Sequence, residues 1–233
     1  MIICIYRINK SIFIISKDYI IKMCYNASSS ITNYTYVTLV SIIVYLYGNN
    51  YDKYVASFLT FTIQIQLMEF FMHLDQKCNL LNKISTLGAY LLIIAQPICV
   101  YYFGNLFGTI NMPDYFQYVY IIYGIFGLIQ WIYYIITDNN ICSKKTDGHL
   151  IWGFEPKNSI IGNINVVAYL LLLLLPFLNF INTNIQIFFI IILFGSCIVH
   201  YILYPKHWKS MWCFFVSGMI TIYAIVRYFN IVY

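Results

Sequence analysis

The stretch VVAYLLLLLL, residues 166–175, is an unbroken run of apolar side chains. A strand of a transmembrane β-barrel alternates between apolar and polar positions, so this run excludes that architecture. The run lies within a longer apolar segment, 160–181, which has the roughly 20 residues that a membrane-spanning helix needs. The segment therefore predicts an all-α fold built from helices that cross a bilayer.

The composition of the whole chain supports the same prediction. The chain has 233 residues, of which 61% are hydrophobic and 9% are charged. A soluble domain is about 45–50% apolar and about 25% charged, so the excess apolar surface requires a bilayer around it. We expect a polytopic integral membrane bundle of about seven transmembrane helices, near residues 31–48, 53–74, 84–104, 115–137, 160–181, 185–204 and 210–231.

Two regions follow from this division: a basic N-terminal extension, 1–22, and a single seven-helix transmembrane domain, 23–233. The extension lacks an uninterrupted apolar region and a small-residue cleavage site, so it is a poor signal peptide. Its isoleucines and basic residues would suit an interfacial helix. We favour the alternative that Met23 is the true start.

The basic residues predict the orientation, because cytoplasmic loops of membrane proteins are rich in Lys and Arg. With seven spans, one side of the membrane holds Arg7, Lys10, Lys17, Lys22, Lys77, Lys83, Lys144, Lys145, Lys157, Lys206 and Lys209. The opposite side holds only Lys53 and Arg227. We therefore expect a cytosolic N-terminus and an extracytosolic C-terminus. Cys24, Cys78, Cys142 and Cys213 lie at or near the predicted cytosolic face, where thiols stay reduced, so we expect no disulfide framework.

Short motifs in the first half of the chain occur in a telling order. They are MCYNASSS (23–30), Met68-Glu69, Cys78-Asn79 with Asn82, and Gln96-Pro97. In these motifs the chain resembles an uncharacterised family of multi-pass membrane proteins that begin Met-Cys, with a Glu in the second span and Gln-Pro in the third. The resemblance implies a membrane fold and no particular chemistry.

The second predicted span, 53–74, carries a polar stripe. Thr62, Gln66, Glu69 and His73 follow one another at intervals of four, three and four residues, which places them on one face of a helix. A carboxylate that faced lipid would cost several kcal/mol, so we expect this face to look into protein or water. Gln96 of the third span is a further candidate for the same site.

The stripe supports three kinds of function. We place first the binding or transport of a small ligand or proton in a polar, cytosol-facing cavity at Glu69, His73, Gln66 and Gln96. The second is an intramembrane enzyme acting on lipid, with or without zinc. The third is a structural or assembly protein in which the stripe only packs helices.

Metal binding is a separate hypothesis. His73, His200 and His207 all fall near the predicted cytosolic face, and zinc takes three or four N, S or O ligands. Such a site would crudely resemble those of intramembrane hydrolases such as the alkaline ceramidases, but those carry a closer histidine pair in the last span. No spaced metal signature is present.

The sequence lacks the residues and motifs that several other cofactors and partners require. Span 210–231 contains no lysine for a Schiff base, which argues against a retinal protein. No nucleotide or nucleic-acid motif is present, and the predicted partner is the lipid bilayer. The loop TDGHLIWGF (146–154) mixes a turn signal with apolar residues, and we expect it to form a lid over the cytosolic mouth.

Overall fold

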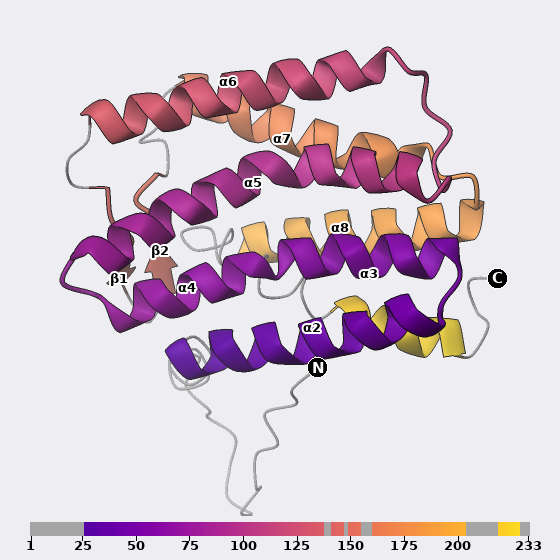
Figure 1. The fold of residues 1–233 in the computed structure, drawn as a ribbon, viewed down its shortest axis with the longest axis horizontal. Helices are drawn as coiled ribbons and strands as arrows, with labels where there is room; N and C mark the ends of the chain where they lie inside the picture. The colour runs from indigo at the N-terminus through magenta and orange to yellow at the C-terminus, as the bar shows by residue number, and fades with distance from the viewer. Residues whose placement is uncertain (1–25, 138–140, 147–148, 155–159, 204–218, 229–233) are drawn as a thin grey trace, which may run out of the picture.

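The computed structural model describes residues 26–137, 141–146, 149–154, 160–203 and 219–228 (Figure 1). The N-terminal extension, 1–22, lies outside the described residues. The labelled helices are α2 (Ala27–Tyr47), α3 (Asn50–Thr62), α4 (Gln64–Leu74), α5 (Leu80–Leu106), α6 (Phe116–Thr137), α7 (Ile160–Leu178) and α8 (Thr183–Leu203). Two short strands, β1 (Lys144–Thr146) and β2 (His149–Ile151), lie between α6 and α7. A final helical stretch is Met219–Tyr228.

The helical character of the chain is confirmed, and five helices are long and apolar enough to cross a membrane. They are Ala27–Tyr47, Asn50–Leu74, Leu80–Leu106, Phe116–Thr137 and Thr183–Ile202. The predicted segments 160–181 and 210–231 correspond to shorter apolar helices, Ile164–Leu178 and Met219–Tyr228, within the described residues. The small sheet of β1 and β2 is an addition that the all-α prediction did not contain.

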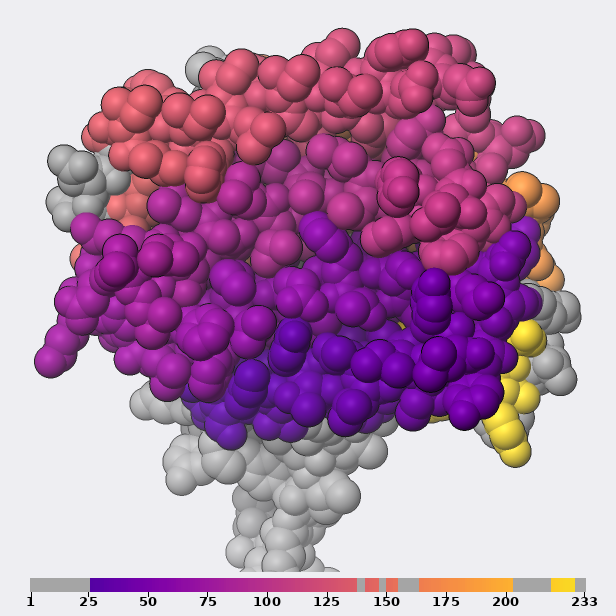
Figure 2. Space-filling model, viewed as in Figure 1, coloured from indigo at the N-terminus to yellow at the C-terminus, as the bar shows by residue number. Residues whose placement is uncertain are grey.

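The long helices run roughly parallel or antiparallel to one another (Figure 1). Helix α5 packs against α3, α4, α6 and α7, and α2 packs against α3 and α4. Figure 2 shows one face of the molecule, on which α6, α5, α3–α4 and α2 follow one another from top to bottom. Helix α6 exposes large apolar side chains such as Ile122 and Ile136, as a helix facing lipid does.

The second span is divided between α3 and α4 at Ile63. The N–H of Gln66 donates to the carbonyl of Ile63, three residues back, so the helix tightens locally at this point. Polar side chains satisfy neighbouring carbonyls: Thr62 Oγ1 donates to Phe58 O and Gln64 Nε2 donates to Thr60 O, both at 2.9 Å. Such substitutes are required in a bilayer, where water does not reach the backbone. Part of the polar character of this span therefore serves the backbone.

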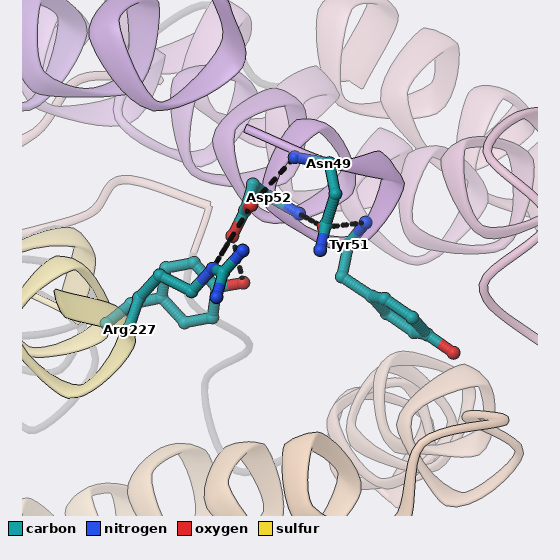
Figure 3. A network of polar contacts seen from close by, with 5 residues as sticks. Asn49, Tyr51, Asp52 and Arg227 are labelled. Carbon is teal, nitrogen blue, oxygen red and sulfur yellow. Dashed lines mark hydrogen bonds and ion pairs between the residues drawn. The ribbon is translucent and has the colours of Figure 1, made fainter. Parts of the chain in front are cut away.

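The last helical stretch is tied to the start of α3 by Asp52 (Figure 3). Asp52 is 2% exposed, and its carboxylate accepts hydrogen bonds from Tyr223 Oη at 2.7 Å and from Arg227 Nε at 3.3 Å. Its other role is local, because Oδ2 accepts the N–H of Asn49 at 2.8 Å while Asn49 Oδ1 caps the first turn of α3. One carboxylate thus holds both the helix start and a contact 175 residues away in the chain.

The opposite end of the bundle holds the turn between α4 and α5 and the sheet of β1 and β2 (Figure 1). The strands pair antiparallel, with Lys144 opposite Ile151 and Thr146 opposite His149. This end contains most of the candidate residues of the sequence.

Candidate functional site

Glu69 lies buried in α4, at 3% exposure, and contacts donors from two different elements. Gln66 Nε2, one helical turn earlier, donates to Glu69 Oε2 at 2.7 Å. Trp152 Nε1, which follows β2, donates to Glu69 Oε1 at 3.2 Å. The carboxylate therefore faces protein, as the polar stripe predicted. Trp152 is itself 3% exposed, so it is a buried partner of Glu69 that the sequence pattern did not identify.

The segment that carries Trp152 covers this end of α4 and α5. We call residues 141–146 and 149–154 the cap segment. Its aromatic end packs on the helices, because Trp152 stacks on Phe154 at 5.4 Å between ring centroids and Phe154 contacts Tyr90 of α5 at 5.0 Å. A Cβ at Gly153 would lie 2.5 Å from the carbonyl oxygen of Cys142, so only glycine permits this close approach.

Asn82 is the main anchor of the cap segment. It is fully buried in α5, and its Nδ2 donates to Ser143 O at 2.9 Å and to Asp75 O at 2.6 Å. Its Oδ1 accepts the N–H of Ser143 at 2.9 Å, and Thr86 Oγ1 lies 2.9 Å from Ser143 Oγ. Asn82 thus pairs with Ser143 through both its donor and its acceptor, as a strand residue would.

A disulfide joins the cap segment to the turn between α4 and α5. Cys78 and Cys142 are bonded, with their Cα atoms 5.6 Å apart. The expectation of reduced thiols without a disulfide was therefore wrong for this pair. The loop positions of both cysteines put them on one side of the predicted membrane, but nothing in the sequence shows that Asn82 and Ser143 bring the two thiols together.

Asp75 organises the same turn. Its carboxylate accepts the N–H of Asn82 at 3.1 Å and the side-chain amide of Asn79 at 3.1 Å, just where α5 begins. A carboxylate at a helix N-terminus is stabilised by the unpaired N–H groups and by the helix dipole. Gln76 completes the contact, because its Oε1 accepts the N–H of Lys145 at 2.7 Å.

The structure does not bring all four predicted site residues together. Gln66 and Glu69 are bonded, and His73 lies half-buried one turn further along α4. Gln96 lies in another part of the bundle, where its Oε1 accepts the hydroxyl of Tyr169 from α7. The expected site at Glu69, His73, Gln66 and Gln96 is therefore divided, and Gln96 serves the contact between α5 and α7.

The metal hypothesis gains no support from the described part of the chain. Among these residues, no group of three or more His, Cys, Asp or Glu side chains could hold a metal ion. His200 Nδ1 lies 2.7 Å from the carbonyl of Ser196 in its own helix. His207 lies outside the described residues, so the set His73, His200 and His207 remains a prediction.

A groove lies elsewhere among the described residues. It has a volume of about 450 Å³, opens between α2, α3 and α5, and is lined by residues that include Ser41, Tyr45, Phe61 and Phe103. Gln66 and Glu69 do not line it. Glu69 of the polar stripe is buried instead, with Trp152 of the cap segment against its carboxylate.

The side-chain oxygen of Gln66, beside Glu69, has no hydrogen-bond partner among the described residues. Gln66 is 1% exposed, and its Oε1 accepts no hydrogen bond there, while its Nε2 is used by Glu69. A buried amide oxygen without a donor costs about 1–3 kcal/mol. The site therefore has acceptor capacity to spare, which suits a proton, a cationic group or a hydrogen-bond donor.

Comparison of the chain with protein-family models, curated proteins and solved structures finds no match.

Proposed function

We propose that the protein is a membrane protein that binds or transports a proton or a small ligand at Glu69, and that the cap segment is a lid closed over this site. The observation that carries the proposal is the hydrogen bond from Trp152 Nε1 to Glu69 Oε1 at 3.2 Å. Through it, a loop element and a membrane helix share one buried carboxylate.

A proton or a cationic donor is the occupant that best fits the chemistry. Gln66 and Trp152 each supply one N–H to Glu69, and Gln66 Oε1 is left as a further acceptor. Ionisable residues inside membrane spans are costly and commonly mark ion or proton pathways. Protonation of Glu69, or arrival of a cationic group, would compete with the indole for Oε1 and so weaken the hold of the lid.

The lid also accounts for access. Trp152 contacts Glu69 of α4 and Phe154 stacks on Trp152, and lifting the cap segment would open Glu69 to the aqueous side. In our proposal all seven apolar segments cross the membrane, and the excess of lysines places the lid at the cytosolic face. The resemblance to the Met-Cys family is compatible with this arrangement and stays a prediction.

The test is proton flux in liposomes. Purified protein is reconstituted with a trapped pH-sensitive dye, and the lumen is followed after an external acid pulse. We expect flux above protein-free liposomes that Glu69→Gln lowers roughly tenfold or more, because the amide cannot exchange a proton. Asp114→Asn is the matched control, since Asp114 is exposed. Flux that is equal in wild type and Glu69→Gln would overturn the proposal.

A structural role is the second candidate, and one observation favours it. The cap segment is anchored to α5 by the hydrogen bonds between Asn82 and Ser143, which do not involve Glu69, and in this second candidate the polar groups serve packing alone. In that case Glu69→Gln would lower the stability of the purified protein and change no flux. The same two variants therefore separate the two candidates.

A further inference from the structure

We propose that the Cys78–Cys142 disulfide is a reversible latch on the lid, and that its reduction by cytosolic thiols releases the cap segment from Glu69. The latch rests on the proposed function at Glu69 and on the cytosolic orientation of this end of the bundle. It assigns these two cysteines as a site of thiol–disulfide exchange.

The position of the bond suits a latch. Cys142 directly precedes Ser143, which docks on Asn82, and Trp152 follows ten residues later over Glu69. Cys78 lies in the turn that joins α4, the helix of Glu69, to α5. The bond closes a loop with a sequence separation of 64 residues, so it keeps the lid near its seat when the hydrogen bonds break.

The bond is also placed where a thiol can attack it. Cys78 is only half-buried, and Gln76, Lys77 and Asn79 around it are exposed. Its backbone is left-handed, with φ at 62°, a conformation that side chains other than glycine rarely adopt. Reduction would free this turn to relax.

Lysines lie close to both cysteines in the sequence. Lys77 is next to Cys78, and Lys144 and Lys145 follow Cys142 as exposed residues. Nearby lysines stabilise a thiolate, which improves a cysteine as a leaving group. They also attract anionic thiols of the glutathione type.

The distribution of lysines indicates the compartment. Among the described residues, this end of the bundle carries Lys77, Lys83, Lys144 and Lys145, whereas Lys53 and Arg227 lie at the other end. The positive-inside rule then makes it cytosolic. Cytosolic disulfides are usually transient and catalytic or redox-sensing, so a disulfide here is conditional.

Reduction of the Cys78–Cys142 disulfide takes two steps of thiol–disulfide exchange. A thiolate of a cytosolic monothiol attacks one sulfur, the S–S bond breaks, and the second cysteine leaves as a thiolate and takes a proton. A second monothiol resolves the mixed disulfide. Overall, two monothiols give two electrons and two protons to Cys78 and Cys142 and become one small-molecule disulfide. An oxidised small-molecule disulfide drives the reverse reaction.

The first experiment reads the redox state in cells. Free thiols are blocked in intact cells with N-ethylmaleimide, disulfides are then reduced, and the new thiols are tagged with a maleimide polymer that shifts the protein on a gel. We expect the tagged fraction at Cys78 and Cys142 to rise with a thiol oxidant and fall with dithiothreitol. Complete tagging under every condition would show a permanent disulfide in an oxidising compartment and overturn the latch.

The second experiment measures hydrogen exchange in the cap segment. Hydrogen exchange by mass spectrometry is compared in oxidised wild type, Cys142→Ser and Cys99→Ser, since Cys99 is a free cysteine. We expect the peptide containing Ser143 and Gly153 to exchange roughly tenfold faster in Cys142→Ser, with Cys99→Ser unchanged. Equal exchange in all three would overturn the latch even if Glu69→Gln abolishes flux. A released lid with flux indifferent to Glu69→Gln would instead overturn the proposed function and leave the latch standing.

Discussion

Replacing Asn82 with alanine should remove most of the hydrogen bonds that anchor the cap segment and lower the free energy of unfolding. The alanine removes the donations to Asp75 O at 2.6 Å and to Ser143 O at 2.9 Å, and the acceptance of the Ser143 N–H at 2.9 Å. Each such bond has a net worth of about 1 kcal/mol, and a buried group left unpaired costs about 1–3 kcal/mol. Thr86 Oγ1 lies 3.1 Å from the same Ser143 N–H and still accepts it. We therefore expect a loss of about 3 kcal/mol in the free energy of unfolding.

The measurement is reversible unfolding of the oxidised protein in mixed micelles with increasing SDS, followed by circular dichroism. Asn105→Ala is the control, because Asn105 lies on the same helix and is exposed. We expect this control to change stability by less than about 0.5 kcal/mol. Asn82→Asp keeps the volume and removes the donor, so it should be at least as destabilising beside the carboxylate of Asp75. A loss below about 1 kcal/mol for Asn82→Ala would refute the role of Asn82 as the anchor.

Three further substitutions test other contacts of the structure by the same unfolding measurement. Trp152→Phe removes the N–H donated to Glu69 and should cost about 1–3 kcal/mol, more than Trp131→Phe, which removes a donation to the carbonyl of Leu87; equal losses would contradict the Glu69 contact. Asp52→Asn weakens the contacts to Tyr223 and Arg227 and should cost about 2 kcal/mol, whereas exposed Asp114→Asn should be neutral. Gly127→Ala places a Cβ 2.6 Å from Ile94 and should cost about 1–3 kcal/mol, while Gly195→Ala meets nothing within 4 Å, so a reversed order would refute the close packing of α5 and α6.

The helical architecture and its long apolar segments were predictable because they depend on hydropathy and length alone. Segments 53–74 and 84–104 correspond to Asn50–Leu74 and Leu80–Leu106 of the structure. The break at Ile63 was not predictable, because the spacing of polar residues does not show that Thr62 and Gln64 both donate to carbonyls of α3. The spacing of polar residues indicates which face of a helix is polar, but it does not indicate where the backbone tightens.

The proximity of Glu69 and Gln66 was predictable because their spacing of three residues fixes them on one helix face. Trp152 was not, because its partner lies 83 residues away and no spacing rule reaches that far. Gln96 was assigned to the same site because polar residues in membrane spans usually face inward. Depth along the bundle separates it from Glu69, and it contacts Tyr169 instead.

The disulfide shows a further limit of sequence reasoning. Loop position correctly suggests that Cys78 and Cys142 share a side, but pairing requires Cα atoms within about 7 Å. That proximity comes from Asn82 and Ser143, which are ordinary polar residues in the sequence.

The central claim is that the cap segment closes Glu69 off from water, and chemical labelling of carboxylates tests it most directly. The oxidised protein in detergent is treated with a water-soluble carbodiimide and an amine, and the labelling rates of Glu69 and exposed Asp114 are compared by mass spectrometry. We expect Glu69 to react at least roughly tenfold more slowly than Asp114, because opening of the lid must precede its reaction. Labelling of Glu69 as fast as that of Asp114 would contradict a closed lid.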